Sequence, residues 1–143
     1  MKSPNRLGIH PGFSQKDFGL IAHGGFGDGL NNYAHSMAWF KDHLYVATMR
    51  GNFPLMRKRL PIAMDIWPVE CPKDPYSLDL CAEIWRYSIH KNSWELVLKA
   101  PKITGSDGNP IPREITYRGM VVYQTNENDA PALYVSTWSP AKG

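Results

Sequence analysis

The sequence predicts an all-β fold built from short antiparallel strands. Aromatic residues make up 12% of the 143 residues, and the five Trp and seven Tyr among them favour strands over helices. Twelve Gly and twelve Pro supply the many turns that short strands need. No stretch shows a sustained helical period, whereas several runs are apolar or alternate between turn residues.

The first clear strands form a predicted hairpin over residues 36–40 and 44–49. Their sequences, S-M-A-W-F and L-Y-V-A-T-M, are rich in the aromatic and β-branched residues that pack well on a sheet. The polar residues between them suit a tight turn. Upstream, residues 17–23 contain the apolar run F-G-L-I-A, which predicts a further strand before a glycine-rich loop over residues 24–29.

Residues 50–80 interrupt this pattern. Five prolines fall in the segment, and proline lacks the backbone N–H that a central strand needs. We therefore expect a long excursion between strands, with one short helical turn near residues 60–66. The densest cluster of positive charge lies here and is expected on a solvated loop. Its members are Arg50, Arg57, Lys58 and Arg59.

Strand signals resume after the excursion. Residues 83–89 alternate in character, and a short polar turn separates them from the next apolar run. In chain order, these further strands are expected over residues 83–89, 93–99, 115–123 and 133–138. Residues 105–110 are rich in Gly, Asp and Asn and predict a loop. Alternation with apolar neighbours predicts burial of four aromatic side chains: Trp39, Tyr45, Trp85 and Tyr134.

Two of these hairpins repeat one pattern, which is the signature of a repeat architecture. Met37 precedes L-Y-V-A-T at residues 44–48, and Met120 precedes L-Y-V-S-T at residues 133–137. The offset between the copies is 120 − 37 = 83 before the turn and 133 − 44 = 89 after it. The second turn is therefore longer, which loops tolerate. In both copies an apolar strand and a glycine-containing loop come before the hairpin.

The run W-R-Y-S-I-H-K-N-S-W at residues 85–94 resembles the kelch-type β-propeller family. Kelch repeats place a Tyr on the third strand of a blade and a Trp at the start of the fourth, and Tyr87 and Trp94 have that spacing. The resemblance implies four-stranded antiparallel blades in one partial domain over residues 1–143. It assigns residues 17–23 as the last strand of one blade, residues 36–99 as a blade with a Pro-rich insertion over 50–80, and residues 115–138 as the start of the next. Propellers need about four to eight blades, so the expected fold is an incomplete β-propeller.

The resemblance also implies a place for a ligand. Propellers bind ligands at the mouth of the central channel, where loops lead into the innermost strands. The candidate ligand-binding residues there are Asn31, Asn32, His35, Arg113 and Arg118. The alternative interpretation is that the Asn residues support tight turns and that His35 is hydrogen-bonded packing. The oxygens of Asp28, Asn31 and Asn32 also offer ligands for calcium, although turn chemistry explains the same residues.

Other features bear on function by exclusion. The net charge of +3 is mild and lacks the concentrated basic face of a nucleic-acid binder, and no apolar run is long enough to span a membrane. Phosphate-binding, zinc-protease and nucleophile-elbow motifs are missing, and the sequence indicates no metal and no cofactor. Cys71 and Cys81 are either free thiols or one loop staple; free thiols are favoured, and with them a cytoplasmic location.

Two classes of function fit these observations. The first is a binding or interaction module within a larger or oligomeric propeller, in which self-association or a partner supplies further blades. The alternative is an enzyme, a hydrolase or lyase acting on a sugar, peptide or small natural product at the channel mouth. Glu83, Glu95 and Glu114 have no spacing that pairs them for acid–base catalysis, which favours the first class.

Overall fold

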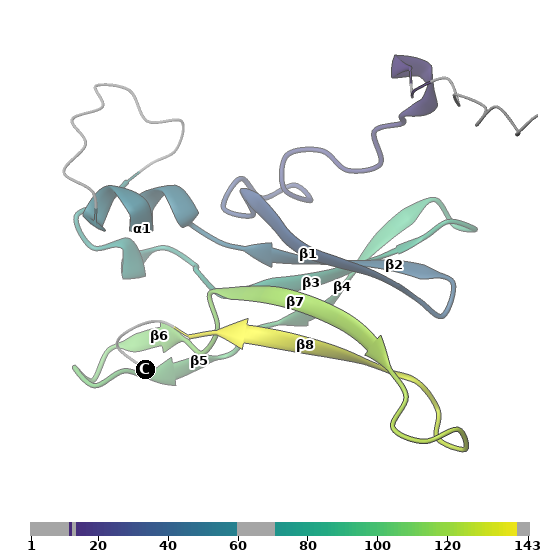
Figure 1. Cartoon of the computed structure of the whole chain (residues 1–143). Helices are drawn as coiled ribbons and strands as arrows, with labels where there is room; N and C mark the ends of the chain where they lie inside the picture. Colours follow the sequence, from purple (N-terminus) through teal and green to yellow (C-terminus); the bar gives the residue numbers. More distant parts are fainter. Residues whose placement is uncertain (1–11, 13, 60–70, 140–143) are drawn as a thin grey trace, which may run out of the picture.

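The structure is a computed structural model that describes residues 12, 14–59 and 71–139. It is made mostly of antiparallel strands, as the composition predicts (Figure 1). The strands are β1 (Tyr33–Phe40), β2 (His43–Met49), β3 (Glu83–Ser88), β4 (Ser93–Lys99), β5 (Lys102–Thr104), β6 (Pro110–Pro112), β7 (Thr116–Tyr123) and β8 (Ala132–Trp138). The helices are α1 (Asn52–Arg59) and the 3-10 turns η1 (Gln15–Asp17) and η2 (Pro75–Ser77).

Strands β1 to β4 form an antiparallel meander in which each strand pairs with the next one along the chain. Tight turns make this possible. Lys41 and Asp42 both have positive φ, 47° and 60°, as the central residues of a two-residue hairpin turn require. Asn92, with φ 47°, lies in the turn between β3 and β4. The predicted hairpins and their turns are therefore confirmed, with β1 beginning three residues earlier than expected.

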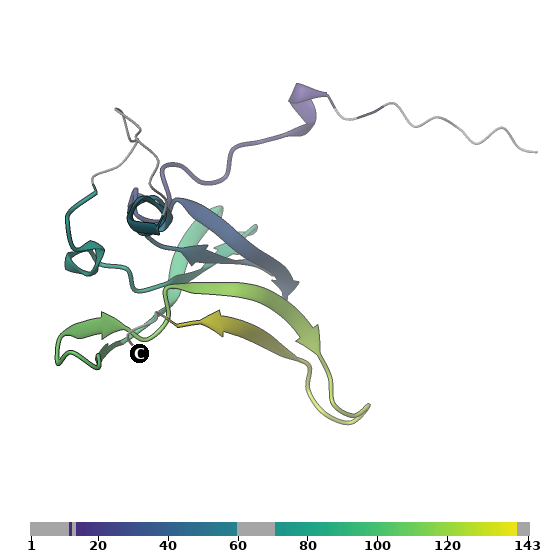
Figure 2. The same cartoon turned by 60° about the vertical axis from the view of Figure 1, so that its left-hand side comes forward.

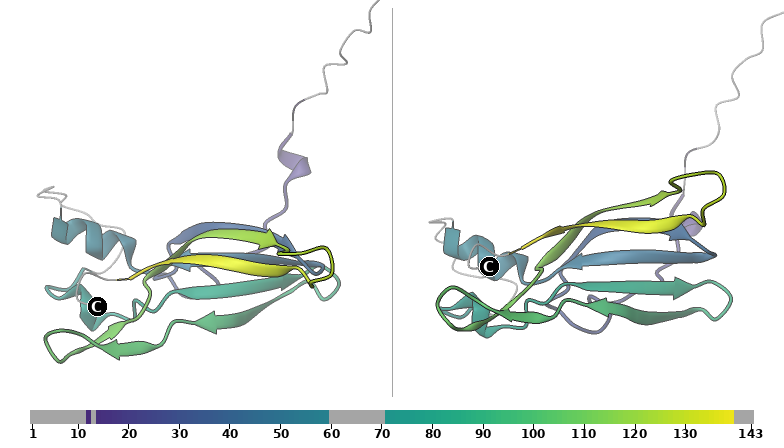
Figure 3. Two further views of the ribbon diagram at one scale, coloured as in Figure 1. Left: turned by 60° about the horizontal axis from the view of Figure 1, so that its bottom comes forward. Right: turned by 90° about the horizontal axis from the view of Figure 1, so that it is seen from below.

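Strands β7 and β8 form a second hairpin that leans against the first. One backbone pair, Met49 with Thr116, joins β2 to β7, and β7 also lies against β1. The two hairpins converge at that pair and splay apart toward their turns (Figures 1 and 2). Helix α1 and the small β5–β6 sheet lie at the convergent end, whereas the hairpin turns lie at the opposite end (Figure 3).

The two hairpins have the same register. Every β1–β2 pair maps onto a β7–β8 pair at the offsets of 83 and 89 residues, from Tyr33–Met49 to Phe40–His43. Both hairpins also carry a bulge at the same place, at His35 in β1 and at Arg118 in β7. The repeat inferred from the sequence is therefore present in the backbone pairing as well as in the residue types.

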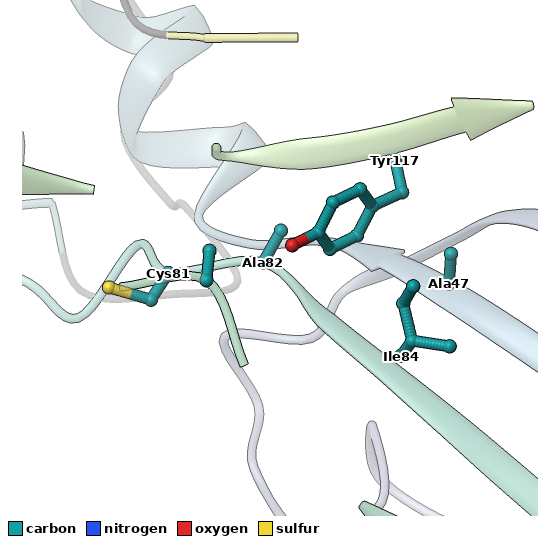
Figure 4. Packing of buried hydrophobic residues seen from close by; sticks show 6 residues of the cluster. Ala47, Cys81, Ala82, Ile84 and Tyr117 are labelled. Atoms are coloured by element: carbon teal, nitrogen blue, oxygen red, sulfur yellow. The ribbon is translucent and has the colours of Figure 1, made fainter. Parts of the chain in front are cut away.

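The main core lies between the meander and the second hairpin (Figure 4). The Tyr117 ring extends from β7 into the space beside the meander, with its hydroxyl end directed toward Ala82, and it belongs to one buried cluster with Ala47 and Ile84. The buried members are Ala47, Cys81, Ala82, Ile84, Ala100 and Tyr117, with Tyr45, Met120 and Val135 packed against them. The β1–β4 and β7–β8 layers thus each bury one face against the other.

The prediction of buried aromatics is wrong for two side chains. Trp39 and Tyr134 are 51% and 50% exposed, while Tyr45 and Trp85 are half-buried. Each of these two side chains points to one face of its strand, as the alternation predicts. In both hairpins, however, this face is the outer one. Within the described residues no further layer covers those faces, so the apolar surface stays in contact with solvent.

Residues 17–23, expected as a strand, do not form one. Only η1 precedes an irregular segment there, and Leu20 is 73% exposed. An apolar run becomes a strand when a neighbour satisfies its backbone groups, and no described strand lies beside this one. Instead, a polar contact ties the segment to the meander, in which Trp94 Nε1 donates to the Ile21 carbonyl at 2.5 Å.

The proline-rich excursion contains no strand in its described part. Helix α1 begins directly after β2 and carries Pro54 in its first turn, where a missing N–H costs little. The helical turn expected over residues 60–66 lies outside the described residues. Conversely, residues 105–109 of the predicted loop form the turn of an unexpected β5–β6 hairpin, and Pro110 begins β6. Cys71 and Cys81 are not joined by a disulfide, and no helix in the described ranges is long and apolar enough to cross a membrane.

Candidate functional site

A cavity of about 320 Å³ opens at the convergent end of the two hairpins. Its walls come from five elements: the starts of β1 and β7, the ends of β2 and β8, and helix α1. The residues that line it are Tyr33, His35, Met49, Asn52, Leu55, Met56, Arg118 and Trp138. The repeat supplies matched positions to this site, because Tyr33 pairs with Met49 in the first hairpin as Thr116 pairs with Trp138 in the second.

The bulges explain how His35 and Arg118 reach the cavity. A bulge places two residues opposite one on the partner strand, which re-aims a side chain that regular alternation would send elsewhere. His35 Nδ1 lies 2.6 Å from Thr116 Oγ1 on the neighbouring hairpin, which fixes the ring. The guanidinium carbon of Arg118 lies 5.9 Å from the centre of the Trp138 ring, within cation–π range.

The two side chains differ in charge. Burial lowers the pKa of His35, and the positive charge of Arg118 lowers it further. His35 is therefore neutral at neutral pH and can make one more hydrogen bond through Nε2. Arg118 is exposed and keeps its charge. The site thus combines the positive charge of Arg118, the neutral imidazole of His35 and the amide of Asn52. Met49, Leu55 and Met56 form an apolar wall beside these groups.

The other candidate residues lie outside the cavity. Asn31 is 6% exposed, and its Nδ2 donates to Glu83 Oε2 at 2.7 Å and to the Gly25 carbonyl at 3.0 Å. Asn32 accepts a bond from the backbone N–H of Asn52, the first residue of α1. Arg113 donates through Nε to Glu114 at 2.5 Å. The structure therefore brings His35 and Arg118 together and places Asn31, Asn32 and Arg113 in supporting contacts.

Arg50, expected on a solvated loop, is fully buried. Its guanidinium donates to Asp28 Oδ2 at 2.7 Å and to Asn31 Oδ1 at 3.0 Å, and it lies 3.2 Å from Glu83 Oε1. Lys99 Nζ extends the network, at 3.1 Å from Glu83. Such a charge is tolerated inside a protein only when it is paired and hydrogen-bonded. Of the other cluster members, Arg57 is exposed, and the side chains of Lys58 and Arg59 lie outside the described part.

The carboxylates of this network stay ionised. Burial pushes the pKa of Glu83 upward, but hydrogen bonds from Asn31 and Trp85 and the charge of Arg50 outweigh it, so the pKa is lowered overall. Asp28 also has a lowered pKa because the Leu30 N–H and Arg50 together outweigh burial. The Asp28 carboxylate therefore accepts a hydrogen bond within a turn and pairs with Arg50, which agrees with the turn interpretation of this residue rather than with a calcium ligand. No group of three His, Cys, Asp or Glu suited to a metal occurs among the described residues.

The sequence reasoning predicted His35 and Arg118 but missed most of the residues that line the cavity. Asn52, Leu55 and Met56 lie on α1, inside the segment interpreted as an irregular excursion. One available signal was the repeat itself: Trp138 follows L-Y-V-S-T as Met49 follows L-Y-V-A-T, so both occupy the same position beside a bulge. The helix carried no comparable signal, because its apolar residues show little one-sided periodicity.

Comparisons with family models, curated proteins and solved structures gave no match to this chain.

Proposed function

We propose that this chain is part of a β-propeller and acts as a binding module whose ligand occupies the cavity lined by His35 and Arg118. The four-stranded meander β1–β4 supports the propeller, since that is the strand order of one blade. The β7–β8 hairpin, which repeats β1–β2 pair for pair, would begin the next blade. The kelch resemblance is supported by Tyr87 on the third strand and Trp94 on the fourth, whose rings lie 5.1 Å apart.

The observation that carries the binding site is the convergence of His35 and Arg118. Each is the bulge residue of its own hairpin, and the two hairpins bring both side chains to one cavity. A bulge locally disrupts the ladder, and bulges are enriched next to functional sites. The position also agrees with the expected mouth of a propeller channel, because both bulges lie near the start of the first strand of each repeat.

The composition of the cavity favours a small organic anion with an apolar body. Arg118 offers a charged donor for a carboxylate or sulfonate, and neutral His35 offers a second polar contact. Leu55, Met56 and the Trp138 ring supply apolar surface for the remainder of the ligand. A fully polar ligand would leave that surface unused.

An enzyme remains the second candidate, acting as a hydrolase or lyase on a sugar, peptide or small natural product. His35 has the lowered pKa that a general base at neutral pH needs. However, the described residues that line the cavity include no carboxylate, and the Thr116 hydroxyl bonded to His35 is fully buried. A substrate would therefore meet a base without a nucleophile or a paired acid, and binding without catalysis accounts better for this set.

Calorimetry with defined probes tests the proposal. Phenylacetate and benzenesulfonate carry an anion on an apolar body, and benzyl alcohol is the matched uncharged probe. We expect the anions to bind the unaltered chain, and Arg118→Ala to weaken that binding about tenfold or more, the value of a charged hydrogen bond. Arg113→Ala is the matched control, since it removes an exposed Arg outside the cavity. Equal losses in both variants, or equal binding of benzyl alcohol, would refute the proposed site.

A further inference from the structure

The two outer faces of the hairpins carry apolar side chains that nothing in the described chain covers. On the second hairpin, Val121 and Tyr134 are 57% and 50% exposed. On the first hairpin, Met37 and Trp39 are 61% and 51% exposed. We call these the tyrosine face (Val121 and Tyr134) and the methionine face (Met37 and Trp39). They lie on opposite sides of the two-layered stack, because each layer buries its inner face against the other.

The repeat identifies what each face resembles. By the matched registers, Tyr134 is the counterpart of Tyr45 and Val121 is the counterpart of Ala38. Tyr45 packs against the core that the meander shares with the second hairpin. The tyrosine face therefore repeats, on the second hairpin, the surface by which the first hairpin holds its neighbour.

The methionine face is the counterpart of the opposite half of that interface. Met37 corresponds to Met120, which packs against the shared core from the second hairpin. Val46, the strand partner of Met37, corresponds likewise to Val135, but it is already buried, so the open part of this face consists of Met37 and Trp39. The chain thus contains one complete interface between hairpins and, on its two outer faces, exposed residues that correspond to part of each half.

The N-terminal segment leaves the methionine face accessible. Phe26 stacks on Trp85 at 4.9 Å and meets Trp94 at 4.7 Å, so this segment covers the β3–β4 side of the meander. Met37 and Trp39 on β1 remain exposed beside it.

We infer that separate copies of this chain associate head to tail, with the tyrosine face of one copy on the methionine face of the next. A second copy is the occupant that fits, because it carries the half that each open face lacks and repeats an interface already formed within the chain. Contacts of this kind are heterologous and close into a ring when the rotation per copy permits. The inference rests on the propeller part of the proposed function and is independent of the ligand.

Light scattering behind a sizing column tests the inference with three variants. Tyr134→Glu places a charge on the tyrosine face, Met37→Glu places one on the methionine face, and Ile89→Glu is the control in the exposed β3–β4 turn. We expect the unaltered chain and Ile89→Glu to form oligomers. Each face variant alone should elute as a monomer of 16.2 kDa. An equimolar mixture of the two face variants should form a dimer and nothing larger, since one intact face remains on each chain.

Three results would overturn the inference. A monomeric unaltered chain would leave the blades of a partner as the occupant of both faces. A dimer that either face variant abolishes and that the mixture does not restore would indicate a two-fold contact. Oligomers that persist in both variants would place the contact elsewhere. Circular dichroism checks folding, and Val121→Glu and Trp39→Glu provide second substitutions on the two faces. A monomer that still binds the anionic probes would refute only this inference. An oligomer that binds none of them would refute only the proposed ligand site.

Discussion

The guanidinium of Arg50 lies 3.2 Å from the carboxylate of Glu83, and both side chains are buried at the convergent end of the sheets. Arg50 follows β2, and Glu83 begins β3, so the pair bridges the ends of two neighbouring strands across the long excursion. Asn31 bonds to both partners and adds the loop that precedes β1. This network therefore fastens three segments to one end of the meander.

Removal of the buried charge should destabilise the fold strongly. Arg50→Met leaves the Glu83 carboxylate buried with Lys99 as its remaining cation, and breaking such a pair costs about 3 kcal/mol or more. Urea denaturation measures the change in the free energy of unfolding. Arg86→Met is the control, because the Arg86–Glu95 pair lies on the surface and should contribute little. If both variants lost a similar amount of unfolding free energy, burial would not explain the importance of the Arg50–Glu83 pair.

Stability should fall as the solution becomes acidic. The pKa values of Glu83 and Asp28 are lowered in the folded chain, so the unfolded chain takes up protons first as the pH falls. The free energy of unfolding should therefore be steady above the ordinary carboxylate range, near pH 4, and decline as the pH falls through the lowered values. Unfolding followed across this range should show a shallower decline for Glu83→Gln. If the free energy of unfolding of Glu83→Gln fell with pH as steeply as that of the unaltered chain, Glu83 would not contribute to the acid sensitivity.

Anion binding should strengthen at mildly acidic pH. His35 has a lowered pKa, so it gains its positive charge only below the usual histidine range, near pH 6.5. Protonated His35 would add to the attraction that Arg118 exerts on an anion. Benzenesulfonate, which stays ionised throughout, should bind more tightly as the pH falls through this region. His35→Gln should remove the pH dependence while keeping a hydrogen-bonding side chain; a dependence that persists would point to another group.

The Tyr117 hydroxyl should contribute nothing to stability. The side chain is 3% exposed, and its hydroxyl makes no hydrogen bond to the described chain. Burial, with the charge of Glu114, raises the pKa of Tyr117 to about 12, so the hydroxyl stays neutral. Tyr117→Phe should leave stability unchanged or raise it by about 1 kcal/mol, because a buried unpaired polar group is lost. Tyr117→Ala should cost about 3–5 kcal/mol by opening a cavity. Thermal unfolding of both variants separates the contribution of the Tyr117 ring to stability from that of its hydroxyl.

The two thiols should differ in reactivity. Burial and the neighbouring Asp79 raise the pKa of Cys81 to about 11, and the thiolate is the form that reacts. A disulfide reagent such as Ellman's should therefore modify Cys71 in the folded chain and reach Cys81 only after denaturant is added. Cys71→Ser should abolish the modification seen in the folded chain. Rapid modification of Cys81 without denaturant would mean that the core around it opens readily.

The hairpins could be predicted because their signals are local. β1 and β2 pair across a two-residue turn, and the β-branched and aromatic residues of L-Y-V-A-T-M favour a strand whatever lies elsewhere in the chain. The run over residues 17–23 contains similar apolar residue types, but no strand of the described chain lies beside it, so it stays irregular. The short β5–β6 strands show the reverse case: Gly, Asp and Asn over residues 105–110 predicted only a loop, and the structure pairs the short segments at its two ends.

The sequence by itself determined the positions of the six long strands β1–β4, β7 and β8, their turns and the repeat, since these depend on residues close together along the chain. Only the tertiary structure decided which faces are buried and which residues share the cavity. Tyr45 and Tyr134 occupy the same place in L-Y-V hairpins, yet Tyr45 is half-buried and Tyr134 is 50% exposed. The physical reason is that burial depends on whether another layer packs on a face, and a second hairpin packs only on the first. Arg50 is buried for the same reason: its partners come from segments that no spacing along the sequence connects.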